Sequence, residues 1–323
     1  MFIWFITVDK LSQIAEQLVR SGVRPSTRRV YDSVQNQYVS FCQSHGLVAV
    51  PASEHTILLF VAQLFVKGLK ASSVRVYMSS IRSLHVQNGF VEGVTNTDRV
   101  KLAIRAIEIN QAPPVQKLPI TLTILQKVHV IIDHSNYSSI LIWCAMCVAH
   151  FACLRTGEFV AKSQTDISSC LFRHNVNITN NSVQLHLRNS KTDTSNRGTD
   201  IVIGCTNQSI CAHCIMHKFC LTRDEYNSHD KPLYIFQNGM VLTRQLFIKQ
   251  TRLYLSLIGV DPSLYSGHSY RAGGATTAAI AGLHDWEIKR LGRWKSHTYH
   301  RYIRPCLTDD KSIAARMFQN QNK

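Results

Sequence analysis

Six side chains suited to phosphate chemistry occur in a fixed order along the second half of the chain: Arg155, Lys191, His268, Arg271, Trp294 and Tyr302. Two arginines can hold the non-bridging oxygens of one phosphate through forked hydrogen bonds. A lysine on a loop can donate a proton to a leaving oxygen. A tyrosine hydroxyl among such cations can act as a nucleophile toward phosphorus.

His268 and Arg271 are three residues apart in His-Ser-Tyr-Arg, a spacing that predicts one shared helix face. The imidazole can accept or donate a proton on the phosphate that the arginine holds. Fixed positive charge around the reacting phosphorus stabilises its transition state. Because the arginines supply the charge that a metal ion would bring, we expect no cofactor and no catalytic metal.

The order of these residues resembles that of the tyrosine recombinases, or integrase family, over nearly the whole chain. The resemblance implies a site-specific recombinase that breaks and rejoins double-stranded DNA through a covalent 3′-phosphotyrosine at Tyr302, as a homo-tetramer and without ATP. Gly-Arg-Trp-Lys-Ser and Arg-Tyr-Ile-Arg are most similar to eukaryotic mobile elements of the Crypton and DIRS types. The expected location is nuclear in a eukaryote and cytoplasmic otherwise.

Three further residues bear on the resemblance. Glu158 matches the acidic residue that follows the first arginine in the family, which implies a supporting role. In many members the His/Trp position lies one residue further from the tyrosine, which here is Arg293, so either Trp294 holds the role or Arg293 shares it. Tyr299 remains a rival nucleophile to Tyr302.

The charge balance favours a polyanionic partner. Lys plus Arg number 36 and Asp plus Glu 20, giving a formal net charge of +16. Such an excess opposes a compact fold unless an anion neutralises it, and nucleic acid is the first candidate. The alternative interpretation of each basic stretch is an ordinary solvent-exposed surface that binds no partner. The residues expected to contact the DNA backbone are Arg75, Arg82, Lys289, Arg290, Lys295, Arg301 and Arg304.

Two other kinds of protein compete with this interpretation. A domesticated, catalytically inactive derivative would hold DNA without cutting it, and a type IB topoisomerase would share the chemistry. A membrane partner is not expected, because the longest apolar run, residues 140–154, is shorter than the ~20 residues of a membrane span.

The patterning predicts a mainly α fold with a small β-sheet (α+β) in two domains. Residues 1–110 form a helical core-binding domain, 111–120 a proline-containing linker and 121–323 a mixed catalytic domain. Helices are expected to begin at Pro25, near Pro51 and Ser53, and at Ser72 or Ser73. Residues 138–154 predict a buried helix. Residues 182–188 alternate as a half-buried strand, with a partner at 201–203.

The ten cysteines are too sparse for a disulfide scaffold. Cys211 and Cys214 have the spacing of zinc ligands, with Cys205, His217 and Cys220 close by. The second half of such a site is irregular, and buried or surface thiols are the simpler interpretation. The family resemblance requires no metal, so zinc binding stays open.

Overall fold

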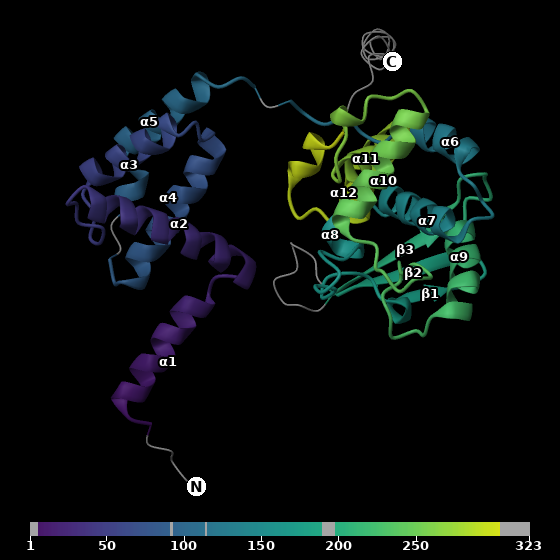
Figure 1. The fold of residues 1–323 in the computed structure, drawn as a ribbon, viewed down its shortest axis with the longest axis horizontal. Helices are drawn as coiled ribbons and strands as arrows, with labels where there is room; N and C mark the ends of the chain where they lie inside the picture. The colour runs from purple at the N-terminus through teal and green to yellow at the C-terminus, as the bar shows by residue number, and fades with distance from the viewer. Residues whose placement is uncertain (1–5, 91–92, 114, 189–197, 304–323) are drawn as a thin grey trace, which may run out of the picture. The chain divides into compact units, whose positions relative to one another are not determined.

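The computed structural model describes residues 6–90, 93–113, 115–188 and 198–303. Two compact units, Met1–Pro114 and Val115–Lys323, make up the chain (Figure 1). The division falls inside the proline-containing segment. Lys191 and Arg304 lie outside the described residues. None of the described helices is both long and apolar enough to cross a membrane.

The first unit is helical throughout its described residues. Its helices are α1 (Val8–Ser21), α2 (Pro25–Ser44), α3 (Glu54–Val66), α4 (Ala71–Gln87) and α5 (Asp98–Ile109), with the short 3-10 helix η1 (Val94–Asn96). Ser53 caps α3 as predicted, its side chain accepting a hydrogen bond from the Thr56 amide at 3.1 Å. Tyr38, Ile57, Val74 and Val100 are among the residues of its core.

The predicted cap of α4 is wrong. The helix begins at Ala71, and Lys70 occupies the N-cap without a side-chain hydrogen bond. The Ala71 amide instead donates to Oε1 of Gln111 at 3.1 Å. A distant side chain thus satisfies a helix-terminal amide that a local serine was expected to satisfy.

The second unit combines helices with one small sheet. The helices are α6 (Leu122–Ile131), α7 (Tyr137–Phe151), α8 (Thr156–Phe159), α9 (Ala212–Tyr226), α10 (Arg244–Leu257), α11 (Ser269–Ile280) and α12 (Asp285–Gly292), and the 3-10 helices are η2 (Arg173–Asn175), η3 (Pro262–Leu264) and η4 (His297–Arg301). The strands β1 (Val176–Ile178), β2 (Ser182–Leu187) and β3 (Thr199–Gly204) are antiparallel in the order β1-β2-β3.

The predicted strand pair is confirmed. In β2 the side chains of Val183, Leu185 and Leu187 are buried while their neighbours are exposed or half-buried, and Val183 pairs with Ile203 of β3. The three-residue strand β1 was not anticipated, because so short a run carries no alternation to recognise.

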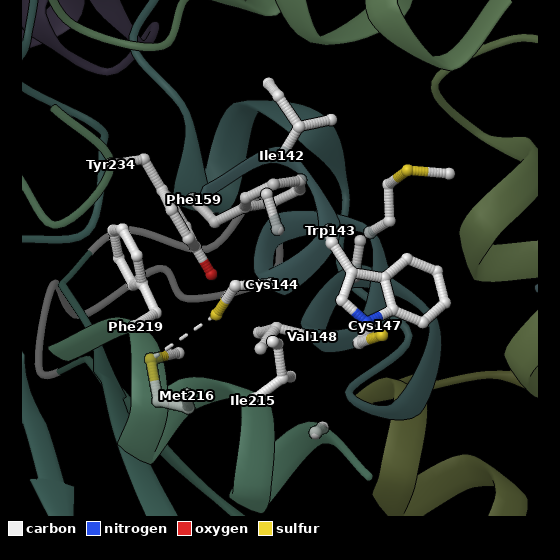
Figure 2. Close-up of a cluster of buried hydrophobic side chains, with 14 of the residues drawn as sticks. Ile142, Trp143, Cys144, Cys147, Val148, Phe159, Ile215, Met216, Phe219 and Tyr234 are labelled. Atoms are coloured by element: carbon white, nitrogen blue, oxygen red, sulfur yellow. Dashed lines mark hydrogen bonds between the residues drawn. The ribbon is translucent and has the colours of Figure 1, made fainter. Parts of the chain in front are cut away.

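Helix α7 is the centre of the second unit, as its all-round apolar sequence predicted. Twelve of its fifteen residues are buried, among them Trp143, Cys144 and Val148. Figure 2 shows Cys144 facing Met216 and Tyr234, with the Cys144 thiol 3.8 Å from the Met216 sulfur, and Trp143 pointing away from them. Since Arg155 follows this helix directly, the core fixes where that arginine emerges.

Two glycines allow α11 to lie against the main chain of its neighbours. A Cβ on Gly273 would come within 1.8 Å of the Ile120 carbonyl oxygen, and one on Gly274 within 2.2 Å of the His150 carbonyl oxygen. Any side chain at either position would push α11 away from α7. The close approach places Arg271, one turn earlier on α11, beside the end of α7.

Candidate active site

One pocket of the second unit gathers four of the six predicted catalytic residues. Arg155, His268, Trp294 and Tyr302 line a hollow of about 510 Å³. They come from the loop after α7, the start of α11, the residues after α12 and the end of η4. Lys191 lies outside the described residues, and Arg271 lies beneath the pocket, as described below.

Arg155 is held by the turn that ends α7. Cys153 adopts φ 47°, which reverses the chain, and Arg155 then becomes the N-cap of α8. Its Nη1 donates to Oε1 of Glu158 at 2.6 Å, while Oε2 of Glu158 accepts from the Arg155 amide at 2.9 Å. The carboxylate therefore fixes both the main chain and the side chain of Arg155.

Arg293 joins the same carboxylate from the other side. It ends α12 in the left-handed conformation (φ 57°), and its Nη2 donates to Oε2 of Glu158 at 2.9 Å. Burial alone would raise the pKa of the Glu158 carboxyl, but Arg293 and Arg155 outweigh it, so that pKa lies below its usual value. Glu158 therefore stays ionised and neutralises part of a buried cationic cluster.

Arg271 is fully buried and does not line the pocket. Its Nη1 donates to the Cys153 carbonyl at 2.6 Å and its Nη2 to the Gly292 carbonyl at 2.5 Å. Burial, then repulsion from Arg155 and Arg293, lowers the pKa of Arg271 to about 10. The guanidinium therefore remains charged at neutral pH.

His268 and Arg271 lie three residues apart at the start of α11 but differ in exposure. Helix α11 begins at Ser269, so His268 is its N-cap and its side chain is exposed at the pocket, whereas Arg271 points into the interior. The His268 backbone is in the right-handed helical region (φ −81°, ψ −12°), and its carbonyl accepts a hydrogen bond from the Ala272 amide at 3.0 Å.

Three N–H groups around the pocket lack an acceptor. Among the described residues, Nε of Arg271, Nε of Arg293 and Nε1 of Trp294 are buried without a hydrogen-bond partner. Buried donors are seldom left unpaired in folded proteins, and such exceptions are typical of binding sites. Of these three residues Trp294 lines the pocket, so an oxygen of an anionic ligand there could accept from its Nε1.

The two tyrosines differ in access. Tyr302 lines the pocket, and its ring centroid lies 5.4 Å from that of Trp294. Tyr299 is fully buried under the same loop, and burial raises its pKa to about 12. In this structure only Tyr302 of the pair can meet a substrate at the pocket.

Some pocket residues were not predicted. Gln116, Lys117, Ser266 and Thr298 also line it. Lys117 was overlooked because it falls in the segment interpreted as linker, yet its Nζ donates to the Ser263 carbonyl at 2.7 Å. The amides of Leu118 and Ile120 likewise donate to the carbonyls of Leu264 and Ser269, so this part of the segment is packed into the second unit. The only feature of the sequence that could have indicated Lys117 was its positive charge next to the predicted catalytic domain.

Of the predicted DNA-contacting residues of the second unit, Arg301 lies at the pocket, whereas Arg290 lines a separate hollow. Arg290, Lys295 and Arg301 are exposed. The Nζ atom of Lys289 lies 3.2 Å from Nε2 of His297. Together they give the surface of α12 and the residues after it a positive charge.

In the first unit, Arg75 and Arg82 line a separate hollow of about 340 Å³ with Lys101. Arg75 forms an ion pair with Glu108 on the exposed surface. This partner was not foreseen, since the two residues are 33 positions apart. The ion pair reduces the net charge that Arg75 offers to a ligand.

Comparison with known proteins relates the chain to recombinases in sequence and in fold. No family model matches the chain. It is 27% identical over 307 residues to an integrase/recombinase XerD homologue of Selenomonas ruminantium, covering 91% of this chain and 86% of that protein.

Solved structures share the fold. The Tn1549 transposon integrase with transposon right end DNA has a TM-score of 0.59 at 12% identity, covering 94% of this chain and 98% of the other. XerH recombinase in a post-cleavage complex has a TM-score of 0.57 at 14% sequence identity, and the match covers 86% of this chain and 75% of XerH. A lambda integrase dimer bound to a core site has a TM-score of 0.54 at 15% sequence identity, and the match covers 92% of this chain and 77% of the integrase chain.

The mainly helical architecture with its small antiparallel sheet is thus the tyrosine recombinase fold, as predicted. Sequence similarity over most of the chain points the same way. The chain is therefore similar in sequence to an integrase/recombinase and has the fold of the tyrosine recombinases.

Proposed function

We propose that this chain is a site-specific DNA recombinase that breaks and rejoins DNA strands through a covalent 3′-phosphotyrosine. The observation that carries the proposal is the pocket itself. A tyrosine and an arginine share its lining with Trp294, whose buried indole N–H has no hydrogen-bond partner. This combination suits a phosphodiester, which brings both an electrophilic phosphorus and anionic oxygens.

The pocket assigns each group a task. The Tyr302 oxygen attacks phosphorus while its proton passes to His268, directly or by way of a phosphate oxygen. The bond to the 5′ oxygen breaks, and that oxygen is protonated and leaves as a 5′ hydroxyl. Arg155 and the Trp294 indole N–H bind the non-bridging oxygens. Arg271 contributes its buried charge and its unpaired Nε from behind Trp294.

Lys191 donates the proton to the 5′ oxygen in this scheme, an assignment that rests on the family resemblance. Attack by a 5′ hydroxyl of another strand on the phosphotyrosine restores a phosphodiester. One ester is exchanged for another at each step, so no ATP is consumed.

Several finer features belong to the proposal as well. Double-stranded DNA is the partner, supported by the exposed cations of α12 and the residues after it and by the DNA present in the related complexes. We infer a homo-tetramer, a eukaryotic mobile element of Crypton or DIRS type, and action in the nucleus, or in the cytoplasm of a prokaryote. An inactive, binding-only derivative is not favoured, because every predicted catalytic residue of the described part is at or directly under the pocket.

The test compares two matched substitutions, Tyr302→Phe and Tyr299→Phe, in the full chain. Each variant is incubated with nicked duplexes taken from the flanks of its own gene, and covalent DNA adducts are separated under denaturing conditions. The nick lets a short fragment diffuse away, which traps the phosphotyrosine. DNA binding is measured in parallel.

We expect Tyr302→Phe to form no adduct while its affinity for DNA stays within about threefold of the wild type, since phosphate and base contacts are retained. Tyr299→Phe is expected to form the adduct. An adduct that survives in Tyr302→Phe, or disappears only in Tyr299→Phe, contradicts the assignment of the nucleophile. No adduct in the wild type on DNA that it binds contradicts the recombinase activity.

A further inference from the structure

Three thiols and an imidazole gather where β3 ends and α9 begins. Cys205 directly follows β3, Cys211 is the N-cap of α9, and His213 and Cys214 lie in its first turn. The Sγ atom of Cys205 is 3.7 Å from the Sγ atoms of both Cys211 and Cys214. The four potential ligand atoms all lie within 4.8 Å of one another.

These separations fit a tetrahedral metal site better than a disulfide. Four ligands around zinc, with Zn–S bonds of ~2.3 Å, place neighbouring sulfurs ~3.8 Å apart. A disulfide would require the sulfurs at ~2.0 Å. The observed 3.7 Å matches the edge of the tetrahedron at both pairs that involve Cys205.

His213 is oriented as metal-bound histidines are. Its Nε2 lies 2.9 Å from the Thr179 carbonyl oxygen, and because a carbonyl can only accept, Nε2 carries the proton. The free lone pair is then on Nδ1, which lies 3.9 Å from the Sγ atom of Cys214. A ring nitrogen that donates to a carbonyl while the other faces the metal is the usual arrangement of a histidine ligand.

A main-chain donor supports the same sulfurs. The Thr206 amide donates to the Cys211 Sγ at 3.3 Å, a contact that stabilises negative charge on a coordinating sulfur. The chain between Cys205 and Cys211 turns back through Asn207, whose φ is 53°. The strand and the helix thereby deliver their thiols to one point.

The ligand set differs from the one the spacing suggested. Cys220 is buried in the core, 3.7 Å from the Met216 sulfur, and His217 is not among the grouped ligands. His217 lies a full turn beyond His213 along α9, so it points to the same side but too far from Cys205. Only the fold reveals that His213 is the fourth member.

We propose that Cys205, Cys211, Cys214 and His213 bind one zinc ion. Four protein ligands leave no open position for water, so the ion is structural. It joins the end of β3 to the start of α9 and, through His213 and Thr179, to the turn after β1. Because β3 directly follows residues 189–197 in sequence, the ion stabilises the strand next to the segment that contains Lys191. The proposal is independent of the proposed function.

The test is metal analysis of the full chain purified under reducing conditions and dialysed against metal-free buffer. We expect about one zinc per chain by mass spectrometry. Replacement by Co²⁺ should give the visible bands of a tetrahedral site with a thiolate charge-transfer band. Cys214→Ser, at an exposed position, should lower bound zinc to roughly a tenth or less, whereas His217→Asn on the same helix should leave it unchanged.

Several results would overturn the proposal. One is that the wild-type protein takes up neither zinc nor cobalt while its thiols react freely. Another is a disulfide between any two of these cysteines under reducing conditions. The third is that Cys214→Ser retains its full zinc content. If Cys214→Ser does not fold, the cobalt spectrum of the wild type decides. A tetrahedral thiolate spectrum supports the site, and a weak octahedral spectrum contradicts it.

Discussion

The guanidinium of Arg271 lies over the face of the Trp294 indole, with its central carbon 4.1 Å from the ring centroid. Arg271 also donates to the carbonyl of Gly292, two residues before Trp294. A Cβ at Gly292 would lie 1.7 Å from the Trp294 ring, so only glycine leaves room for this stacking. Two motifs that are 23 residues apart in sequence therefore act as one unit.

Trp294→Phe should separate the two contributions of this tryptophan. Phenylalanine keeps an aromatic face over Arg271 but lacks the indole N–H. We expect the free energy of unfolding to fall by about 1 kcal/mol, while adduct formation slows about 10- to 100-fold because a donor to an anionic oxygen is lost. Unfolding in denaturant and single-turnover cleavage of nicked DNA measure the two effects.

Trp286→Phe is the matched control, since Trp286 lies on α12 but is 60% exposed. It should change neither quantity appreciably. Equal slowing of cleavage in both variants would show that Trp294 makes no special contact with the phosphate.

Glu158→Gln should destabilise the second unit by about 3 kcal/mol, because removing one partner of a buried ion pair leaves charge uncompensated. The side chains of Glu158 and Arg293 are only 4% and 8% exposed. Denaturant unfolding followed by tryptophan fluorescence measures the change, and three of the four tryptophans belong to the second unit.

Lys162→Gln breaks the exposed pair between Lys162 and Asp166 in the same unit. It should cost less than about 1 kcal/mol. A Glu158→Gln effect as small as this would mean that Arg155 and Arg293 are held by their other contacts alone.

Acid should weaken the second unit through His150. This residue is fully buried, its Nδ1 donates to the Ile120 carbonyl, and burial lowers its pKa to about 4. The unfolded chain takes up a proton below its ordinary pKa of ~6.5, whereas the folded chain does so only near 4. The stabilisation is complete above that ordinary value and is lost between it and about pH 4.

Between pH 7 and pH 5 this group should cost about 2 kcal/mol of unfolding free energy. His150→Gln, which keeps an N–H donor, should remove that part of the pH dependence. His217→Gln, at an exposed position of α9, should leave it intact. Parallel pH profiles of the wild type and His150→Gln would contradict the assignment.

The local patterns determined much of the fold. The all-round apolar run of α7, the alternation in β2 and the serine before α3 each reflect physics within a few residues, namely burial, pleat and capping. The order and types of the six predicted catalytic residues likewise led to the predicted chemistry and to the family resemblance before any contact was known.

The tertiary structure decided everything that depends on residues far apart in sequence. Arg271 lies beneath Trp294, Tyr302 is accessible where Tyr299 is buried, Glu158 is shared by two arginines, and His213 rather than His217 joins the thiols. Spacing along the chain fixes which residues share one helix or strand. Which elements approach each other depends on close packing, such as that of α11 on α7 at Gly273 and Gly274, and no short stretch of sequence encodes that packing by itself.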